Sequence, residues 1–285
     1  MPRDAPHIAA RALLLGAVAV ALAAGPACRR ASARATTSVQ DAPDAGSGCG
    51  AARAPARGET FRTPGGRTFH VWTPTNYDPK VAHPLVVTYH GIGTDGLAFA
   101  SWFKMEDHVE DAAIVVYPDA NRGLWDLDGA RDLDFFDALV DATSRAFCVD
   151  RARIHAFGFS YGAKMVHHLG CKRTGRLRAI AAGDGSWAAE EGCGSLPVLV
   201  THRTRDDDEL VGWGRGAMTR WLGHNGCAKT TTAPDALGCV AHDGCKKPVI
   251  WCEDTFYDAT WPRDWNHTVR EEHRDRVWRF FRDLR

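Results

Sequence analysis

Short apolar runs alternate with amphipathic stretches along most of the chain, and each kind of stretch predicts a different element. Runs rich in β-branched residues and bounded by Gly, Pro or polar residues predict strands buried on both faces of a sheet. These runs lie at residues 85–91 and 112–119. Further strands are predicted at 153–160, 179–182, 197–201 and 249–252, and residues 61–73 predict two short strands around a Pro-Gly-Gly turn. Amphipathic stretches predict helices at 133–147, 163–171 and 269–284. Strands that alternate with helices predict a mostly parallel central sheet with helices on both faces, whose reactive groups gather at the carboxyl ends of the strands.

A glycine-flanked serine stands where the predicted strand at 153–160 gives way to a helix. The residues Gly158-Phe159-Ser160-Tyr161-Gly162 match the pattern G-x-S-x-G. A nucleophile at this place needs a sharp turn, and glycines on both sides let the two backbones pass without collision. An ordinary glycine-rich turn is the alternative. The strand before it and the helix after it favour a nucleophilic serine and the α/β-hydrolase fold.

The strand that begins after Pro84 ends in His90-Gly91. In an α/β-hydrolase fold, one oxyanion-hole N–H comes from the residues after this strand and another from the residue after the nucleophile. We therefore expect Ile92 and Tyr161 to be the oxyanion-hole donors. The alternative is that His90-Gly91 merely turns the chain.

An acidic run follows the predicted strand at 197–201. The acid of a catalytic triad comes after the nucleophile in this fold, so the candidates are Asp206, Asp207, Asp208 and Glu209. We favour Asp206, with Asp207 as the alternative. At least three of the four are expected to be solvated loop carboxylates.

The general base must be a histidine later in the chain. His267 follows the strand at 249–252 and precedes the final helix, which gives it a loop at the reactive edge of the sheet. His224 and His242 lie among the cysteines and lack such a setting, and His273 is expected on the surface of the final helix. We therefore predict that His267 takes the proton of the serine hydroxyl while the acid fixes its tautomer.

The first residues have the layout of a secretory signal. Arg3 and Arg11 precede an apolar run from Ala12 to Gly25, which small residues close before Cys28. The run is short for a membrane span, so residues 1–27 are predicted to be a signal peptide rather than a retained anchor. Cys28 stands where a bacterial lipoprotein carries its lipid, which makes it a candidate acceptor for a lipid anchor.

The rest of the chain divides into a tether and one domain. Residues 28–48 are rich in small and polar residues, cannot bury much surface, and are predicted to be a flexible linker. Residues 49–285 suit a single α/β domain.

The formal net charge is zero, so nothing indicates a nucleic-acid partner. We expect a monomer that needs no metal and no cofactor.

The cysteines favour an exported, disulfide-stapled domain. The chain has nine cysteines, and without Cys28 an even set remains. A zinc site is the alternative, because four cysteines cluster between Cys227 and Cys252 near His242. No Cys-x-x-Cys pair occurs, however, so the spacing favours disulfides.

Several further motifs resemble one family of esterases. They are GCG at 48–50, TPTNYDP at 73–79, PLVVTYHG at 84–91, DLDFFDAL at 132–139, GFSYGAKMVHHLGC at 158–171, NGC at 225–227, VIWC at 249–252 and VWRFF at 277–281. Together they resemble the secreted feruloyl esterases and polyhydroxybutyrate depolymerases of the carbohydrate esterase family 1 type. The resemblance implies the roles of Ser160, Asp206 and His267 given above, and it suggests a disulfide between Cys171 and Cys193.

The chain departs from the family pattern at two places. Arg203 replaces the glycine expected beside His202, and Asn266 replaces the glycine expected before the final histidine. In addition, Trp261-Pro262 precedes that histidine instead of following it.

The expected function is a secreted serine ester hydrolase that forms an acyl-enzyme. Its expected substrates are plant cell-wall esters, such as feruloyl or acetyl groups on xylan. A depolymerase for short-chain polyhydroxyalkanoates is the first alternative. A surface lipoprotein that binds carbohydrate on an inactive hydrolase scaffold is the second. Trp102, Trp125, Trp187 and Trp213 could line the pocket of either enzyme, or they could pack in the core and at its rim.

Overall fold

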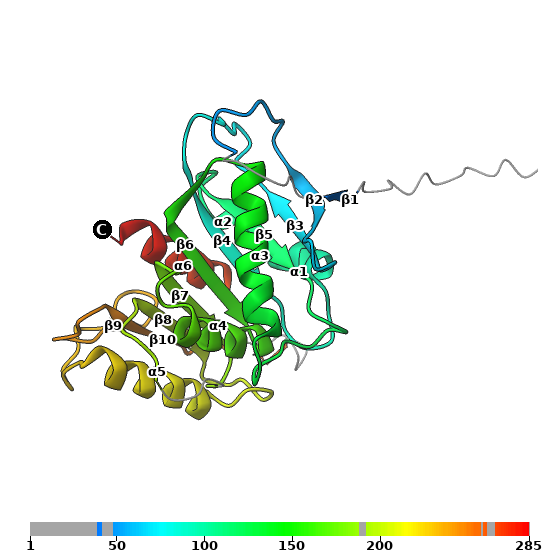
Figure 1. Ribbon diagram of the computed structural model, residues 1–285. Helices are drawn as coiled ribbons and strands as arrows, with labels where there is room; N and C mark the ends of the chain where they lie inside the picture. The colour runs from blue at the N-terminus through cyan, green and yellow to red at the C-terminus, as the bar shows by residue number, and fades with distance from the viewer. Residues whose placement is uncertain (1–38, 42–47, 188–191, 258, 261–265, 285) are drawn as a thin grey trace, which may run out of the picture. The chain divides into compact units, whose positions relative to one another are not determined.

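The computed structural model describes residues 39–41, 48–187, 192–257, 259–260 and 266–284. These residues form one ten-stranded sheet with helices on both faces (Figure 1). The predicted signal peptide, Cys28 and most of the predicted linker lie outside the described residues. Within the predicted linker, Val39–Asp41 forms the short edge strand β1, which pairs with β2.

The sheet is mostly parallel, as the alternation of strands and helices predicts. Its strands are β1 (Val39–Asp41), β2 (Arg57–Arg62), β3 (Thr68–Trp72), β4 (His83–Tyr89), β5 (Ile114–Pro118), β6 (Val149–Phe159), β7 (Ala179–Gly183), β8 (Val198–Arg203), β9 (Cys239–Ala241) and β10 (Val249–Asp254). They lie in the order β1-β2-β3-β5-β4-β6-β7-β8-β10-β9. Strands β5, β4, β6, β7, β8 and β10 are parallel to their neighbours in this series, whereas β3 and β9 pair antiparallel at its two sides.

The central strands are apolar because both faces of the sheet are covered. All seven residues of β4 are buried. Successive side chains of a strand point to opposite faces, so Leu85 and Val87 enter one hydrophobic core while Val86 enters the other. The continuous apolar run in the sequence is therefore the signature of a strand in the middle of the sheet.

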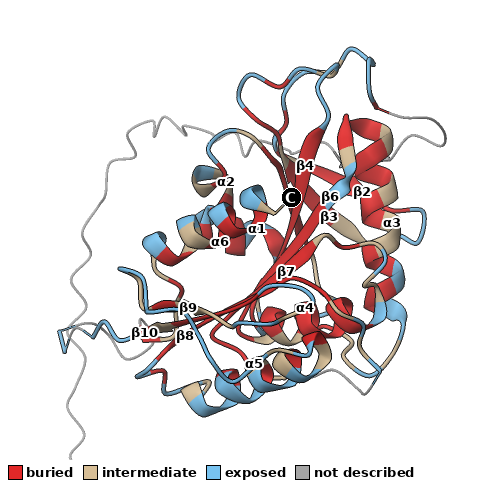
Figure 2. Cartoon of the chain, turned by 90° about the vertical axis from the view of Figure 1, so that its left-hand side faces the viewer, coloured by how far each residue is buried: buried red, intermediate tan, exposed pale blue. Residues whose placement is uncertain are grey.

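Six helices of the described residues cover the two faces of the sheet. They are α1 (Gly96–Phe103), α2 (Met105–His108), α3 (Arg131–Ala146), α4 (Tyr161–Lys172), α5 (Val211–Asn225) and α6 (Glu271–Asp283). Figure 2 shows α1, α2 and α6 on one side of the sheet and α3, α4 and α5 on the other. None of the described helices is long and apolar enough to cross a membrane.

The predicted helices correspond to α3, α4 and α6, whereas α1, α2 and α5 are not predicted. Helix α5 carries four glycines, which lower its helix propensity, so the sequence does not predict a helix there. One of them, Gly214, is needed for packing. A Cβ at this position would lie 2.2 Å from Nδ1 of His202 on β8, so only glycine lets the helix approach the sheet this closely.

In the described residues, four disulfides join cysteines that lie 13 to 99 residues apart in sequence. They are Cys49–Cys148, Cys171–Cys193, Cys227–Cys245 and Cys239–Cys252. The expectation of a disulfide-stapled domain is confirmed, and so is the pair Cys171–Cys193 suggested by the family resemblance. The zinc alternative is wrong, because the four clustered cysteines all form disulfides.

Candidate active site

Ser160 occupies the sharp turn between β6 and α4. Its backbone has φ 56° and ψ −121°, a conformation that L-residues rarely adopt and that costs free energy. The Ser160 N–H donates to the carbonyl of Gly183 at the end of β7, at 2.9 Å, which helps to hold this turn. The side chain is nearly buried, with the whole residue 8% exposed.

The glycines of the G-x-S-x-G pattern are required by close backbone contacts. A Cβ on Gly158 would lie 2.1 Å from the carbonyl oxygen of Gly162. A Cβ on Gly162 would lie 2.2 Å from the carbonyl oxygen of Tyr89 at the end of β4. The start of α4 therefore packs directly against two strand ends, and the turn lifts Ser160 above the sheet.

His267 lies between Ser160 and Asp206. Its Nε2 is 2.8 Å from Oγ of Ser160, and its Nδ1 is 2.6 Å from Oδ2 of Asp206. A carboxylate only accepts hydrogen bonds, so the Nδ1 proton faces Asp206 and Nε2 is left to accept the serine proton. The structure thus brings together the three residues selected from the sequence, which approach from the loops after β6, after β8 and before α6.

The member of the acidic run that forms a hydrogen bond with this histidine is Asp206, the acid favoured from the sequence. Its side chain is fully buried, and its Oδ1 accepts hydrogen bonds from the N–H groups of Asp208 and Glu209, each at 2.9 Å. The alternative candidate Asp207 is exposed. Glu209 instead forms an ion pair with Lys164 on α4, at 2.7 Å.

The two expected oxyanion-hole donors are the residue after the serine and a residue of the loop after β4. Tyr161 is the first residue of α4, and Ile92 lies on the loop after β4. Neither N–H forms a loop, turn or cap hydrogen bond within the part of the chain that the structure describes. The loop also passes close to the nucleophile, since a Cβ on Gly91 would lie 3.6 Å from Oγ of Ser160.

A second buried carboxylate, which the sequence reasoning missed, lies near the acid. Asp184 follows β7 and accepts a hydrogen bond from the N–H of Arg203 at 2.7 Å. Burial, followed by the charge of Asp206, raises the pKa of Asp184 well above its usual range. The neutral form of Asp184 is therefore favoured, which relieves repulsion of the Asp206 carboxylate. The sequence signal that could have identified Asp184 is its position directly after the buried strand β7.

Asp254, at the end of β10, holds the base of the loop that carries His267. Its two oxygens accept hydrogen bonds from Nε and Nη2 of Arg270 at 2.7 and 2.8 Å. Burial opposes ionisation of Asp254, but the bonds from Arg270 and from the N–H of Phe256 outweigh it and lower the pKa of the carboxyl group. This bidentate pair fixes the chain only three residues after His267.

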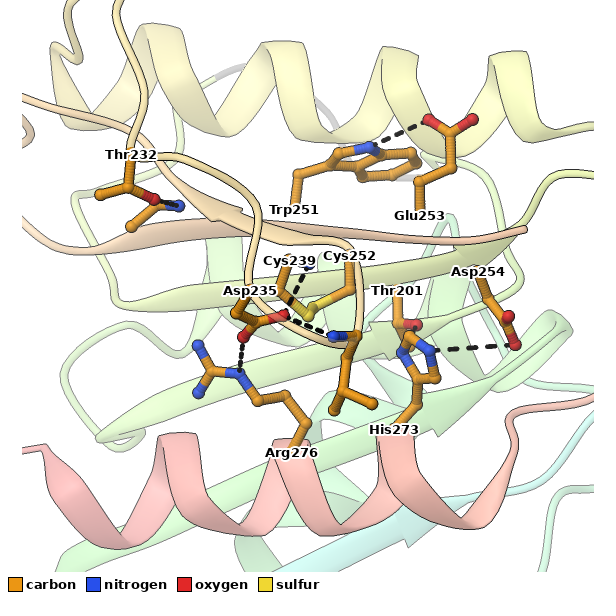
Figure 3. Close-up of a disulfide and its surroundings, with 12 residues drawn as sticks. Thr201, Thr232, Asp235, Cys239, Trp251, Cys252, Glu253, Asp254, His273 and Arg276 are labelled. Carbon is orange, nitrogen blue, oxygen red and sulfur yellow. Dashed lines mark hydrogen bonds and ion pairs between the residues drawn. A yellow bond between two sulfur atoms is a disulfide. The ribbon is translucent and has the colours of Figure 1, made fainter. Parts of the chain in front are cut away.

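The expectation that His273 lies on the surface of the final helix is wrong. The residue is 1% exposed, and its Nδ1 is 3.0 Å from Oγ1 of Thr201 on β8. Figure 3 shows its ring pointing from α6 toward the sheet, between Thr201 and Asp254 and beside the disulfide Cys239–Cys252. His273 lies on the face of α6 that packs against the sheet. Its neighbours in sequence are mostly charged, so the hydrophobic pattern of the helix did not indicate that this position is buried.

Two groups of described residues could in principle offer three ligand atoms to a metal ion. One consists of Cys239, Cys252 and His273, but the two sulfurs are joined in a disulfide. The other consists of Asp184, His202 and Asp206. There, Asp206 binds His267, and His202 donates through Nε2 to the carbonyl of Glu209 at 2.7 Å. Both groups are thus occupied by bonds within the protein.

A cleft of about 800 Å³ opens beside His267. Trp102 on α1, Phe159 at the end of β6 and Phe256 after β10 form its aromatic walls. Charged residues from the start of α6, including Glu271 and Arg274, line the rest.

The four tryptophans considered from the sequence take different places. Trp102 and Trp213 are each 48% exposed, but only Trp102 lines the cleft. Trp125 is buried below the loop after β4, and Trp187 packs against Trp221 and His224.

Comparison with known proteins agrees with this fold. No family model matches the chain. A protein from Aspergillus terreus named probable feruloyl esterase C is 26% identical over 216 residues, which cover 71% of this chain and 79% of that protein. An acetyl xylan esterase from Aspergillus awamori superposes with a TM-score of 0.58 at 16% identity, over 77% of this chain and 95% of that one. A ferulic acid esterase from Anaeromyces mucronatus, solved with ferulic acid, gives a TM-score of 0.55 at 14% identity, over 82% and 92%.

The fold is that of the α/β-hydrolases, and the curated relatives support the assignment of the chain as a carboxylic ester hydrolase. Within that class, its similarity is to the feruloyl esterase group, in agreement with the motifs in the sequence.

Replacing Asp254 by Asn should destabilise the protein in a pH-dependent way. Loss of the charged hydrogen bonds to Arg270 should cost about 1.5–3 kcal/mol at neutral pH. An aspartate of the unfolded chain titrates near pH 4 and the folded carboxyl titrates lower, so its contribution is complete above the unfolded pKa and is lost as the pH falls through the folded pKa. Urea unfolding should therefore show a smaller difference between wild type and Asp254→Asn at about pH 3 than at neutral pH.

The matched control is Asp150→Asn, which removes the partner of Arg153 in an exposed ion pair. This change should cost less than about 1 kcal/mol. An Asp254→Asn variant as stable as wild type at neutral pH would contradict the role assigned to the pair.

Proposed function

We propose that Ser160, His267 and Asp206 are the catalytic triad of a serine esterase that acts on plant cell-wall esters through an acyl-enzyme. The observation that carries the proposal is the chain of contacts at 2.8 and 2.6 Å from the serine hydroxyl through the imidazole to the buried carboxylate. An inactive carbohydrate-binding scaffold would have no need to keep this alignment or the strained backbone at Ser160.

In the proposed mechanism, His267 removes the proton from Oγ of Ser160 as the oxygen attacks the ester carbonyl carbon. The N–H groups of Ile92 and Tyr161 stabilise the negative charge that develops on the carbonyl oxygen. The imidazolium, steadied by Asp206, then protonates the leaving alcohol, and the acyl group stays on the serine. Water, activated by the same imidazole, attacks this ester in the second half of the reaction and releases the acid.

The cleft beside His267 favours a large acyl group as the substrate. Its volume of about 800 Å³ is far more than an acetyl group needs and lies in the usual range for drug-sized ligands. The rings of Trp102 and Phe256 offer the kind of walls that bind a planar aromatic acid. We therefore infer that feruloyl esters are better substrates than acetyl esters, which agrees with the names of the relatives.

We also propose that the protein is exported. Four disulfides are typical of proteins that fold in an oxidising compartment, and residues 1–27 have the layout of a signal peptide. Cys28 is the proposed lipid acceptor.

Reaction with a fluorophosphonate probe tests the catalytic role of the serine. Wild type should be labelled at Ser160, and Ser160→Ala should not be labelled while it keeps the same melting temperature within a few degrees. Ester hydrolysis by the variant should fall by on the order of 10⁴–10⁶-fold. Labelling at another residue, or normal hydrolysis by folded Ser160→Ala, would refute the proposal.

The acyl preference is tested with Trp102→Ala. Loss of this wall should lower kcat/KM for methyl ferulate by about tenfold or more, because 1–3 kcal/mol of binding is lost, with little effect on p-nitrophenyl acetate. Trp213→Ala is the matched control, since that ring is equally exposed but lies outside the cleft. Equal effects on both esters would argue against an aromatic acyl site. A hydroxybutyrate oligomer assayed in parallel tests the depolymerase alternative.

Export is tested by the mass of the protein isolated from the envelope of a bacterial host. The mature chain should begin at Cys28 and carry the extra mass of its lipid. A protein that still begins at Met1 would contradict the signal peptide, whereas an unlipidated mature chain would contradict the anchor alone.

A further inference from the structure

We propose that His90 is a positioning residue for the oxyanion hole: by holding the carbonyl group of Gly91, it directs the N–H of Ile92 toward the reacting ester. This inference rests on the proposed function, because it concerns the same reaction. It assigns to the histidine after β4 a task that the triad does not include.

The hydrogen bonds of His90 fix the position of its proton. The ring is fully buried, and its Nε2 lies 3.1 Å from the backbone N of Ala120. A backbone N–H only donates, so Nε2 must accept and the ring proton must be on Nδ1. That Nδ1 lies 2.6 Å from the carbonyl oxygen of Gly91, which only accepts. Both contacts are satisfied by one tautomer of the neutral ring.

The neutral state of His90 is the one that its surroundings favour. Burial lowers the pKa of His90, although the bond to Gly91 and nearby carboxylates act in the opposite direction. A protonated ring would carry a second N–H pointing at the N–H of Ala120, so it could not keep this contact.

The bond to Gly91 sets the direction of the next N–H. A peptide group is planar and trans, so the C=O of Gly91 and the N–H of Ile92 point in opposite directions. Because His90 holds the carbonyl on one side, the Ile92 N–H must leave on the other. Without that bond the peptide could rotate, and the donor would no longer be fixed before the substrate arrives.

The held peptide lies beside the nucleophile. A Cβ built on Gly91 would lie 3.3 Å from Cβ and 3.6 Å from Oγ of Ser160. A small rotation of the Gly91–Ile92 peptide therefore changes the surroundings of the reacting oxygen directly.

The loop after β5 keeps His90 itself in place. Besides Ala120, it supplies Trp125, whose indole N–H donates to the carbonyl of His90 at 2.9 Å and whose ring centroid lies 4.7 Å from that of the imidazole. The same loop accepts a hydrogen bond from the N–H of Gly93 through the carbonyl of Gly123, at 3.0 Å. The oxyanion loop is thus held at both ends.

Two amide substitutions separate the two ring nitrogens. In His90→Asn, the side-chain NH₂ can take the place of Nδ1 and still donate to Gly91. In His90→Gln, the amide reaches the place of Nε2 and can contact Ala120, but the donor to Gly91 is lost. The rate of acylation by p-nitrophenyl acetate should fall by about 10²-fold in His90→Gln, with KM little changed, and His90→Asn should restore most of this loss.

Affinity for a transition-state analogue provides the second readout. A boronic acid forms a tetrahedral adduct with the serine and places an oxygen in the oxyanion hole, so His90→Gln should weaken its binding by a similar factor. The matched control is His83→Gln. His83 lies at the other end of β4, where its Nδ1 contacts the carbonyl of Ala112, and its loss should leave acylation and boronate binding unchanged.

A measurement on the wild-type protein keeps the proposal testable even if the variants do not fold. The ¹⁵N spectrum of the imidazole should show a protonated Nδ1 and an unprotonated Nε2 for His90. The opposite tautomer would overturn the proposal, as would normal acylation by folded His90→Gln or equal losses in His90→Gln and His90→Asn. Wild type that hydrolyses esters through Ser160 in any of these cases would leave the proposed function intact.

Discussion

The contact between the imidazole of His267 and the hydroxyl of Ser160 is the interaction on which the proposed chemistry of this protein depends. A serine hydroxyl is a weak nucleophile at neutral pH and reacts only when a base accepts its proton. At 2.8 Å, Nε2 is within reach of that proton, and the buried carboxylate of Asp206 keeps the ring in the required tautomer. The three groups come from loops far apart in sequence, so the contact exists only because the fold brings those loops to one edge of the sheet.

Much of the fold serves to hold these loops. The parallel strands end together, glycines at 158 and 162 allow α4 to start against the end of β4, and the turn between them accepts a strained backbone at Ser160. The ion pair between Asp254 and Arg270 fixes the chain after His267. His273 packs the first turn of α6 against β8 through its contact with Thr201. On the other side of the serine, His90 and the loop after β5 hold the peptide that precedes Ile92. The candidate active site is thus supported by buried polar groups, each of which has a partner on a neighbouring loop or strand.

The sequence predicts the sheet and the reactive residues because these follow local rules. Apolar runs mark β4 to β8, and the order of serine, acid and histidine selects three residues that the structure brings together. The sequence does not predict α5, because the glycines of this helix lower its helix propensity. It also does not predict the burial of His273, because the neighbours of this residue on α6 are charged. The roles of Asp184, Asp254 and His90 depend on contacts between loops distant in the chain, which no local pattern records. Arg203, which replaces an expected glycine, is buried, and Asp206 still contacts His267.

A crystal structure of the protein after reaction with a small alkyl phosphonate would test the central claim most directly. The proposed triad predicts a covalent bond from Oγ of Ser160 to phosphorus, Nε2 of His267 within hydrogen-bond distance of the adduct, and the phosphoryl oxygen facing the N–H groups of Ile92 and Tyr161. An unmodified Ser160, or an adduct with His267 turned away from it, would contradict the proposed triad.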